Sequence, residues 1–304
     1  MLPTAWVLDR GEPARPRLRL ARFLPVYLTL EVAGLAAALG LLLVRPLTDR
    51  DRWLRLHTRL QGWWAASMLR GASRVFDWRL EVEGQADVRP GPVLVFARHV
   101  SLVDTLLPHH VIANLGGLRL RYVLKRELLW DPCLDVVGNR LPNVFVDRSG
   151  VDTAREAAAV GALAHGLGPD EAVLIYPEGT RFTHAKRERA LQRIAGRSPE
   201  RSARVEKLVH VLPPRSGGPS ALLDAVPEAD LVVLAHTGLE GLGTLGDALH
   251  GGLVDRTIRV RVWRIRADAL PAAADRVEWL DARWAEVDAW VGAHQAAPLS
   301  PDRR

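Results

Sequence analysis

A histidine and an aspartate with four residues between them, His99 and Asp104, follow the apolar run GPVLVF. Histidine is mostly neutral at cellular pH, so it can take a proton from a hydroxyl as that oxygen attacks. A carboxylate that accepts a hydrogen bond from the other ring nitrogen would fix the tautomer and stabilise the imidazolium. The pair therefore predicts a general base and its orienting partner.

The same spacing occurs twice more, at His165 and Asp170 and at His250 and Asp255. Spacing alone does not choose among the three pairs. His99 stands where an apolar strand ends and a helix is expected to begin, which is where open α/β sheets bind ligands. The other two histidines stand at a helix end and in a glycine loop, so we select His99.

The attacking hydroxyl is expected to come from the substrate. Ser101 lies between His99 and Asp104, but the sequence has no G-x-S-x-G nucleophile elbow. A second polar cluster, YPEGTR at 176–181, also follows an apolar run, EAVLI, and ends in a carboxylate, a glycine, a hydroxyl and a guanidinium.

From about residue 78, short apolar runs alternate with helical patterns, which predicts an α/β domain. The expected strands are 78–84, 93–97, 120–125, 143–148, 172–179, 231–238 and 257–265. The expected helices are 102–115, 152–166 with Asp152 as N-cap, and 276–294 with Trp279, Trp284, Val287 and Trp290 toward the core.

The N-terminal part has the features of a membrane anchor. Residues 23–44 are apolar except for Glu31 and Pro25, and are long enough to cross a hydrocarbon core. The segment 51–76 then alternates tryptophans and leucines with arginines, as an interfacial helix does. Arginines flank the apolar stretch on both sides, so the positive-inside rule gives no orientation. A two-helix anchor in one leaflet, a single span and a buried core helix remain the alternatives.

Composition limits the classes of partner. Of 304 residues 48% are hydrophobic, and the single cysteine, Cys133, excludes an internal disulfide. No Cys/His cluster has zinc spacing, so we expect no metal. The net charge of +6 is concentrated at 185–207, where eight Lys or Arg face three Glu. This segment is either a solvated loop or a surface for an anionic membrane or a phosphorylated molecule; no aromatic-basic pattern indicates nucleic acid.

Taken in order, His99 and Asp104, NVFVDR at 143–148 and YPEGTR resemble the glycerolipid acyltransferase family, which includes 1-acylglycerol-3-phosphate acyltransferases. FTHAKRERA and HVLPPRSGG at 210–218 resemble its longer subgroup. The resemblance covers roughly 50–240. It implies a mixed sheet flanked by helices, an N-terminal helical membrane anchor and a catalytic domain on the cytoplasmic side.

The resemblance also implies roles for residues. His99 would be the catalytic base and Asp104 its orienting aspartate. A phosphate monoester suits a guanidinium fork plus a point charge, and glycine lets the backbone approach closely. The implied substrate-binding residues are Lys125, Arg148, Glu178, Gly179, Thr180 and Arg181. For Arg148 an ion pair with a neighbouring carboxylate is the alternative, and Pro214 and Arg215 are expected to shape the site.

Two positions depart from the pattern of many relatives, which carry Asn before the histidine and an aromatic residue farther on. Arg98 and Leu102 stand there instead. A cation beside His99 would either lower the pKa of His99 or contact substrate phosphate. The sequence leaves both interpretations open.

The implied function is transfer of a fatty acyl group from acyl-CoA, or from acyl carrier protein, to a hydroxyl of a lysophospholipid. The expected acceptor is 1-acylglycerol-3-phosphate, and the product phosphatidic acid. Acyl-CoA is a co-substrate, and no metal or redox cofactor is expected. Another lysolipid, a thioesterase or lipid hydrolase using the same pair, and a non-catalytic lipid-binding protein are the alternatives. The expected domains are the anchor at 1–75, the catalytic domain at 76–295 and a tail at 296–304.

Overall fold

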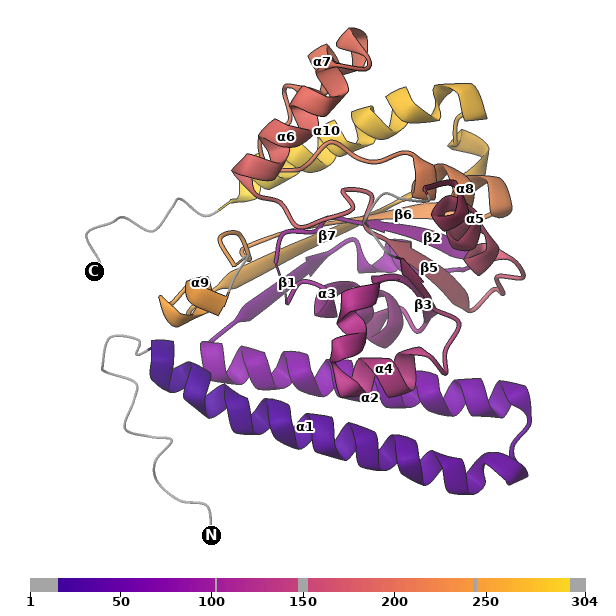
Figure 1. Ribbon diagram of the computed structural model, residues 1–304, viewed down its shortest axis with the longest axis vertical. Helices are drawn as coiled ribbons and strands as arrows, with labels where there is room; N and C mark the ends of the chain where they lie inside the picture. Colours follow the sequence, from indigo (N-terminus) through magenta and orange to yellow (C-terminus); the bar gives the residue numbers. More distant parts are fainter. Residues whose placement is uncertain (1–15, 102, 147–152, 243–244, 296–304) are drawn as a thin grey trace.

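The computed structural model describes residues 16–101, 103–146, 153–242 and 245–295. Within them, seven strands form one mixed sheet in the order β1-β7-β6-β2-β5-β3-β4, with helices on both faces (Figure 1). This confirms the predicted mixed sheet flanked by helices. The strands are β1 (Arg79–Glu83), β2 (Val93–Ala97), β3 (Arg119–Lys125), β4 (Val144–Val146), β5 (Glu171–Ile175), β6 (Asp230–Thr237) and β7 (Thr257–Ile265).

The central strands all end at one edge of the sheet. Strands β6, β2, β5, β3 and β4 are parallel, whereas β7 is antiparallel to β6 and parallel to β1. All five residues of β2 are buried, as expected for an apolar run in a parallel sheet covered on both faces. The segments that follow β2, β5 and β3 are therefore brought to the same edge.

Each expected strand is present, and the last expected helix has the predicted bounds. Helix α10 (Arg276–His294) buries Trp284, Val287 and Trp290 against the sheet, and Trp279 is half-buried. Helix α5 (Thr153–Ala164) matches the expected helix at 152–166. Its predicted N-cap, Asp152, lies outside the described residues.

The helix expected at 102–115 begins later than predicted. Helix α3 (Leu106–Pro108) leads into a π-helical turn, η3 (His109–Leu115). The physical reason is a side-chain turn before it. Ser101 Oγ accepts the N–H of Asp104 at 3.2 Å, and the Asp104 carboxylate accepts the N–H of Ser101 at 2.8 Å. These bonds compete with the helical ones.

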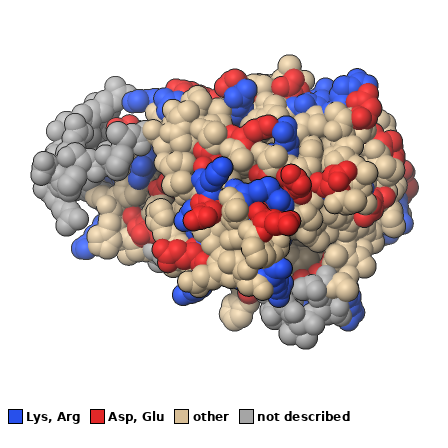
Figure 2. Space-filling view, turned by 90° about the horizontal axis from the view of Figure 1, so that it is seen from above, with Lys and Arg blue, Asp and Glu red and all other residues tan. Residues whose placement is uncertain are grey.

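The basic segment is helical rather than a loop. Helices α6 (His184–Ala195) and α7 (Pro199–Val205) begin at caps formed by Thr183 and Ser198. Arg201 on α7 forms a forked ion pair with the buried Asp281 of α10. Figure 2 shows basic and acidic residues interspersed over this face, so the segment does not form a uniform cationic surface.

Several shorter elements complete the fold and were not predicted. The helices are α4 (Pro132–Gly138), α8 (Gly217–Ala225) and α9 (Leu245–Leu249). The 3-10 turns are η1 (Arg45–Leu47), η2 (Gln85–Val88), η4 (Arg126–Trp130), η5 (Ala267–Ala269) and η6 (Ala273–Asp275).

The N-terminal part is an antiparallel pair of helices, α1 (Pro16–Val44) and α2 (Arg50–Phe76), joined by η1 (Figure 1). Helix α2 packs against the sheet domain and buries Leu69, Ala72 and Phe76 in the core beneath the sheet. The boundary at 75 and 76 stays a prediction, since α2 continues across it. Among the described helices, α1 with η1 is the stretch long and apolar enough to cross a membrane, by length and composition.

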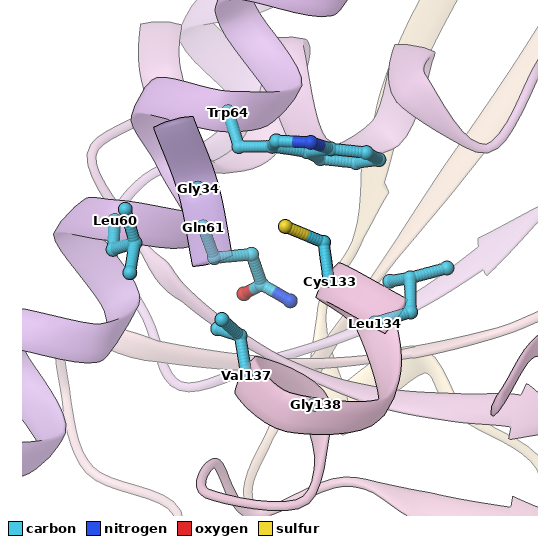
Figure 3. Close-up of a pocket in the computed structure, with 8 residues that line it drawn as sticks. All are labelled: Gly34, Leu60, Gln61, Trp64, Cys133, Leu134, Val137 and Gly138. Atoms are coloured by element: carbon cyan, nitrogen blue, oxygen red, sulfur yellow. The ribbon is translucent and has the colours of Figure 1, made fainter. Parts of the chain in front are cut away.

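Helix α1 approaches the catalytic part closely at one point. A Cβ on Gly34 would lie 2.6 Å from the Sγ of Cys133 on α4, so only glycine fits there. Beside this contact, α1, α2 and α4 line a small open pocket of about 20 Å³ (Figure 3). Its lining is Gly34, Leu60, Gln61, Trp64, Cys133, Leu134, Val137 and Gly138. None of the predicted site residues lines it.

Candidate active site

His99 and Asp104 meet immediately after β2. The Nδ1 of His99 lies 3.0 Å from Oδ1 of Asp104, so Nδ1–H donates to the carboxylate. The Asp104 side chain is fully buried, while that of His99 is 14% exposed. This arrangement leaves Nε2 of His99 as the ring nitrogen for a substrate hydroxyl.

Asp104 is held as a carboxylate. Its Oδ2 accepts the N–H groups of Val100 at 2.5 Å and Ser101 at 2.8 Å. Burial alone would raise the pKa of Asp104, but the charge of His99 and the hydrogen bonds from His236 and His99 hold that pKa well below its usual range. The aspartate can therefore stabilise a proton on His99 throughout the physiological range.

The other two histidines with the same spacing lack this geometry in the described part of the chain. His165 and His250 are exposed, and Nδ1 of His250 lies 2.7 Å from the carbonyl oxygen of Gly246 in its own helix turn. Ser101 is fully buried, and its Oγ accepts the N–H groups of Val103 and Asp104. The geometry therefore supports His99 as the base and gives Ser101 a structural role.

The segment after β5 packs directly on the histidine. The N–H of Phe182 donates to the carbonyl oxygen of His99 at 2.9 Å. The ring of Tyr176 lies 4.6 Å from the His99 ring, centroid to centroid, and forms one wall. The sheet thus joins the two polar clusters that the sequence singled out.

Glu178 connects three backbone segments. One oxygen accepts the N–H of His99 at 3.1 Å and the other accepts the N–H of Leu212 at 2.9 Å. Glu178 is 2% exposed. Burial raises the pKa of Glu178 to about 7, against the opposing effects of Arg98 and the two N–H groups. In this structure the carboxylate holds the backbone around His99, while contact with an acceptor stays a prediction.

Substituting Glu178 by Gln should separate stability from turnover. A pKa raised from 4.5 to about 7 means that the contribution of Glu178 to stability is full below about 4.5 and is lost as the pH rises through 7. The Gln variant should therefore gain stability relative to the parent across this window, measured by denaturant unfolding at several pH values. Its turnover should fall, because the two N–H groups of His99 and Leu212 are accepted by different oxygens of Glu178, and in Gln one of these oxygens is replaced by an NH2 group, which only donates. The exposed Glu81→Gln is the control, and parallel curves for parent and variant would contradict the assignment.

Four basic side chains lie at or near this segment: Arg181, Lys186, Lys125 and Arg215. Gly179 has a φ of 72°, and a Cβ there would meet the Arg215 side chain at 2.7 Å, so the turn needs glycine. Lys186 Nζ donates to Thr180 Oγ1 and to the Arg181 carbonyl, both at 3.1 Å. Burial, then the charges of Arg181 and Lys125, lower the pKa of Lys186.

Lys186 was not among the predicted site residues, because it stands in the basic segment at 185–207, where its spacing does not distinguish it from the other Lys and Arg residues. Lys125 also pairs with Glu127 at 2.6 Å. Arg148 and Leu102 lie outside the described residues, so their predicted roles stay predictions. The structure therefore brings together Lys125, Glu178, Gly179, Thr180 and Arg181 of the predicted binding residues.

Arg98 points away from the open side of the site. Its guanidinium is fully buried and donates to the carbonyl oxygens of His236 at 2.6 Å and His210 at 2.8 Å, and to Glu240 at 2.6 Å. The interpretation that Arg98 contacts substrate phosphate is therefore wrong for this structure. The arginine instead fixes the backbone from which His99 projects.

Comparison with known proteins identifies a family model and a similar fold. Residues 79–217 match the model of the Acyltransferase family. The crystal structure of PlsC, the 1-acyl-sn-glycerophosphate (LPA) acyltransferase from Thermotoga maritima, superposes with a TM-score of 0.57 at 15% identity, covering 92% of this chain and 100% of PlsC. At this identity the likeness concerns the fold. No curated protein sequence matches significantly. Residues 79–217 therefore match the acyltransferase family, and the fold of the chain is similar to that of PlsC.

Proposed function

We propose that this protein is a membrane-associated O-acyltransferase. It moves a fatty acyl group from a thioester, acyl-CoA or acyl carrier protein, to a hydroxyl of a lysophospholipid, with 1-acylglycerol-3-phosphate as the acceptor and phosphatidic acid as the product. The observation that carries the proposal is the 3.0 Å contact between His99 and Asp104, placed beside the cations around Thr180 and Arg181.

The chemistry follows from the tautomer of His99. Because Nδ1–H donates to Asp104, the lone pair of Nε2 takes the proton of the acceptor hydroxyl as its oxygen attacks the thioester carbonyl. The tetrahedral intermediate collapses by breaking the C–S bond, and the departing sulfur takes the proton from the His99 imidazolium. Buried Asp104 stabilises that imidazolium between the two transfers.

The charges near the base favour a phosphate monoester. Arg181 and Lys186 lie on the segment that packs on His99, and Lys125 is close enough to Lys186 to lower the pKa of its ammonium group. A guanidinium and two ammonium groups suit a dianionic head group. The cationic nitrogen of a choline or ethanolamine head group would be repelled.

The test is an acyl transfer assay on purified protein. Oleoyl-CoA is supplied with lysophosphatidic acid, lysophosphatidylcholine, lysophosphatidylethanolamine or no acceptor, and the products are identified by mass. We expect ester formation with lysophosphatidic acid and a raised KM for that acceptor in Arg181→Gln and Lys186→Gln. Lys207→Gln, an exposed lysine just beyond α7, is the control. Preference for lysophosphatidylcholine would refute the acceptor, and CoA release independent of any lysolipid would indicate a thioesterase.

The exposed face of α1 supports the membrane part of the proposal. The cytoplasmic side is proposed for the catalytic domain from the family resemblance. Large apolar side chains there remain uncovered by the described chain: Leu24, Leu28, Val32, Leu39, Leu42 and Leu43. A contiguous apolar surface of this kind on a helix marks contact with a lipid or a protein. The length and composition of α1 favour lipid.

Charged substitutions on that face should weaken membrane binding. Leu28 and Leu39 are 52% and 59% exposed, so replacing both by Glu leaves the packing of α1 on α2 intact. The variant should sediment with phospholipid vesicles several-fold less than the parent, because each carboxylate opposes insertion of the helix face. Val209→Glu is the matched control, because Val209 is an apolar residue that is 50% exposed and lies next to α10, away from α1. Equal sedimentation of all three proteins would refute the α1 surface as the lipid contact.

A further inference from the structure

A second histidine lies beside the buried side of the catalytic pair. His236, on β6, is fully buried. Its Nε2 lies 3.1 Å from the carbonyl oxygen of Arg98 and 3.5 Å from Oδ2 of Asp104. A carbonyl oxygen only accepts hydrogen bonds, so Nε2 of His236 carries a hydrogen and shares it between these two oxygens.

The position of His236 is fixed by the strands. Ala97, the last residue of β2, is in register with Leu234 of β6, and the N–H of Arg98 donates to the Leu234 carbonyl at 3.0 Å. Beyond that point Arg98 and His236 join the two strands by two side-chain hydrogen bonds, each to the backbone carbonyl of the other residue. Nη1 of Arg98 donates to the carbonyl of His236, and the ring of His236 donates to the carbonyl of Arg98. The backbone that leads into His99 is thus attached to β6.

The surroundings of His236 leave Nε2 as its hydrogen-bonding nitrogen. The charged groups around it are Asp104, Arg98 and Glu240, and the last two are paired with each other at 2.6 Å. Its Nδ1 is buried and has no hydrogen-bond partner in the described part of the chain. A proton on Nδ1 would be a buried donor without an acceptor, which is costly. His236 therefore acts as a donor through Nε2.

We propose that His236 is a positioning residue for acyl transfer: its Nε2–H holds Oδ2 of Asp104 and the carbonyl of Arg98, so that Oδ1 of Asp104 stays directed at Nδ1 of His99. The proposal rests on the proposed function for one point, the use of His99 as the base. It adds a contact to the far oxygen of the aspartate, where Val100 and Ser101 already donate.

Two effects follow from removing the His236 donor. The Asp104 carboxylate loses one of the contacts that orient it, so it is less often aligned with His99 and turnover falls. Without His236, the negative charge of Asp104 is also stabilised by fewer hydrogen-bond donors. It therefore stabilises the imidazolium of His99 more strongly whenever the two are in contact. The acid limb of the activity profile then moves to higher pH.

The experiment compares two substitutions at one position. In His236→Gln the amide nitrogen reaches about as far as Nε2 and keeps the donor, whereas His236→Leu removes it at similar volume. In the acyl transfer assay we expect the Leu variant to lose about 10- to 100-fold in kcat with little change in KM. We expect its acid limb to move up by about half a pH unit. The Gln variant should keep most of the activity and the parent profile.

A matched control removes another buried histidine. His109 is 3% exposed, bonds to Tyr122 and does not contact Asp104, so His109→Leu reports the effect of losing a buried imidazole elsewhere in the core. Activities are divided by the folded fraction from circular dichroism. The proposal would be overturned if kcat of His236→Gln fell as far as that of His236→Leu. It would also be overturned if His236→Leu kept the acid limb of the parent.

A readout without substrate separates this proposal from the proposed function. The hydrogen between His99 Nδ1 and Asp104 should give a downfield proton signal in NMR spectra, which His99→Ala removes. The proposal expects this signal to shift or broaden in His236→Leu and to stay in His236→Gln and His109→Leu. If the signal behaves so but no lysolipid is acylated, the acyltransferase proposal fails and the role of His236 stands. An unchanged signal in His236→Leu overturns the role of His236 whatever the activity.

Discussion

Replacing His99 by Ala should lower acyl transfer by about 100-fold or more without unfolding the protein. The histidine side chain is partly exposed at the open side of the site, and its Nδ1 is committed to Asp104 at 3.0 Å. The substitution therefore removes the group that takes the hydroxyl proton and leaves the core intact. The measurement is turnover of oleoyl-CoA with lysophosphatidic acid, with circular dichroism to establish folding.

The chain provides its own controls for this substitution. His165 and His250 have the same spacing to an aspartate but are exposed. His165→Ala and His250→Ala should keep the parent turnover. A loss with His165→Ala as large as that with His99→Ala would show that the choice among the three pairs was wrong. Retained activity in a folded His99→Ala protein would remove the base from the mechanism.

Replacing Arg98 by Leu should cost about 3–5 kcal/mol of unfolding free energy. The guanidinium is fully buried, and its loss leaves the carbonyls of His236 and His210 without this donor and Glu240 without its cation, although Glu240 keeps the N–H of Gly238. The Arg98–Glu240 ion pair contributes less than this to stability, because the cost of desolvating both groups offsets their attraction. Removing Arg98 alone costs more, because it leaves the charge of Glu240 unpaired. Denaturant unfolding of parent and variant in the same detergent measures the loss.

An exposed arginine pair gives the comparison. Arg266 contacts Asp268 at 2.9 Å, and both side chains are largely in solvent, so Arg266→Leu should change stability little. Similar midpoints for the parent and the Arg98→Leu protein would contradict the buried network. A stable Arg98→Leu protein with lost turnover would instead assign Arg98 to the chemistry.

Much of the fold could be predicted from local pattern. The central apolar runs became strands because parallel strands buried on both faces need continuous hydrophobic residues. The outer strands β1 and β7 instead alternate in burial, which is the period-2 pattern of a half-buried strand. Helix α10 kept its expected bounds because its apolar spacing is helical and its tryptophans face the sheet. The late start of the helix after Asp104 could not be predicted from periodicity, because the side chains of Ser101 and Asp104 take the backbone N–H groups first.

The site residues that directly follow a single strand could be predicted from the sequence. Those brought into the site by the order of the strands in the sheet could not. His99, Asp104 and Gly179 follow apolar runs directly. His236 sits 138 residues beyond Arg98, inside an apolar run where a histidine gives no local signal. The order of the sheet makes β6 the neighbour of β2, and single-sequence periodicity carries no information about that order. For the same reason the sequence could not show that Arg98 points inward.

The inward arginine has an evolutionary consequence. Arg98, Glu240 and the two carbonyls form one buried unit, so residue 98 and residue 240 constrain each other's replacement. In chains that carry Asn at the position before the histidine, a partly buried carboxylate at the position of Glu240 would lack its cation. Arg and Glu are therefore expected to be inherited together, and either one alone should mark an intermediate that was selected against.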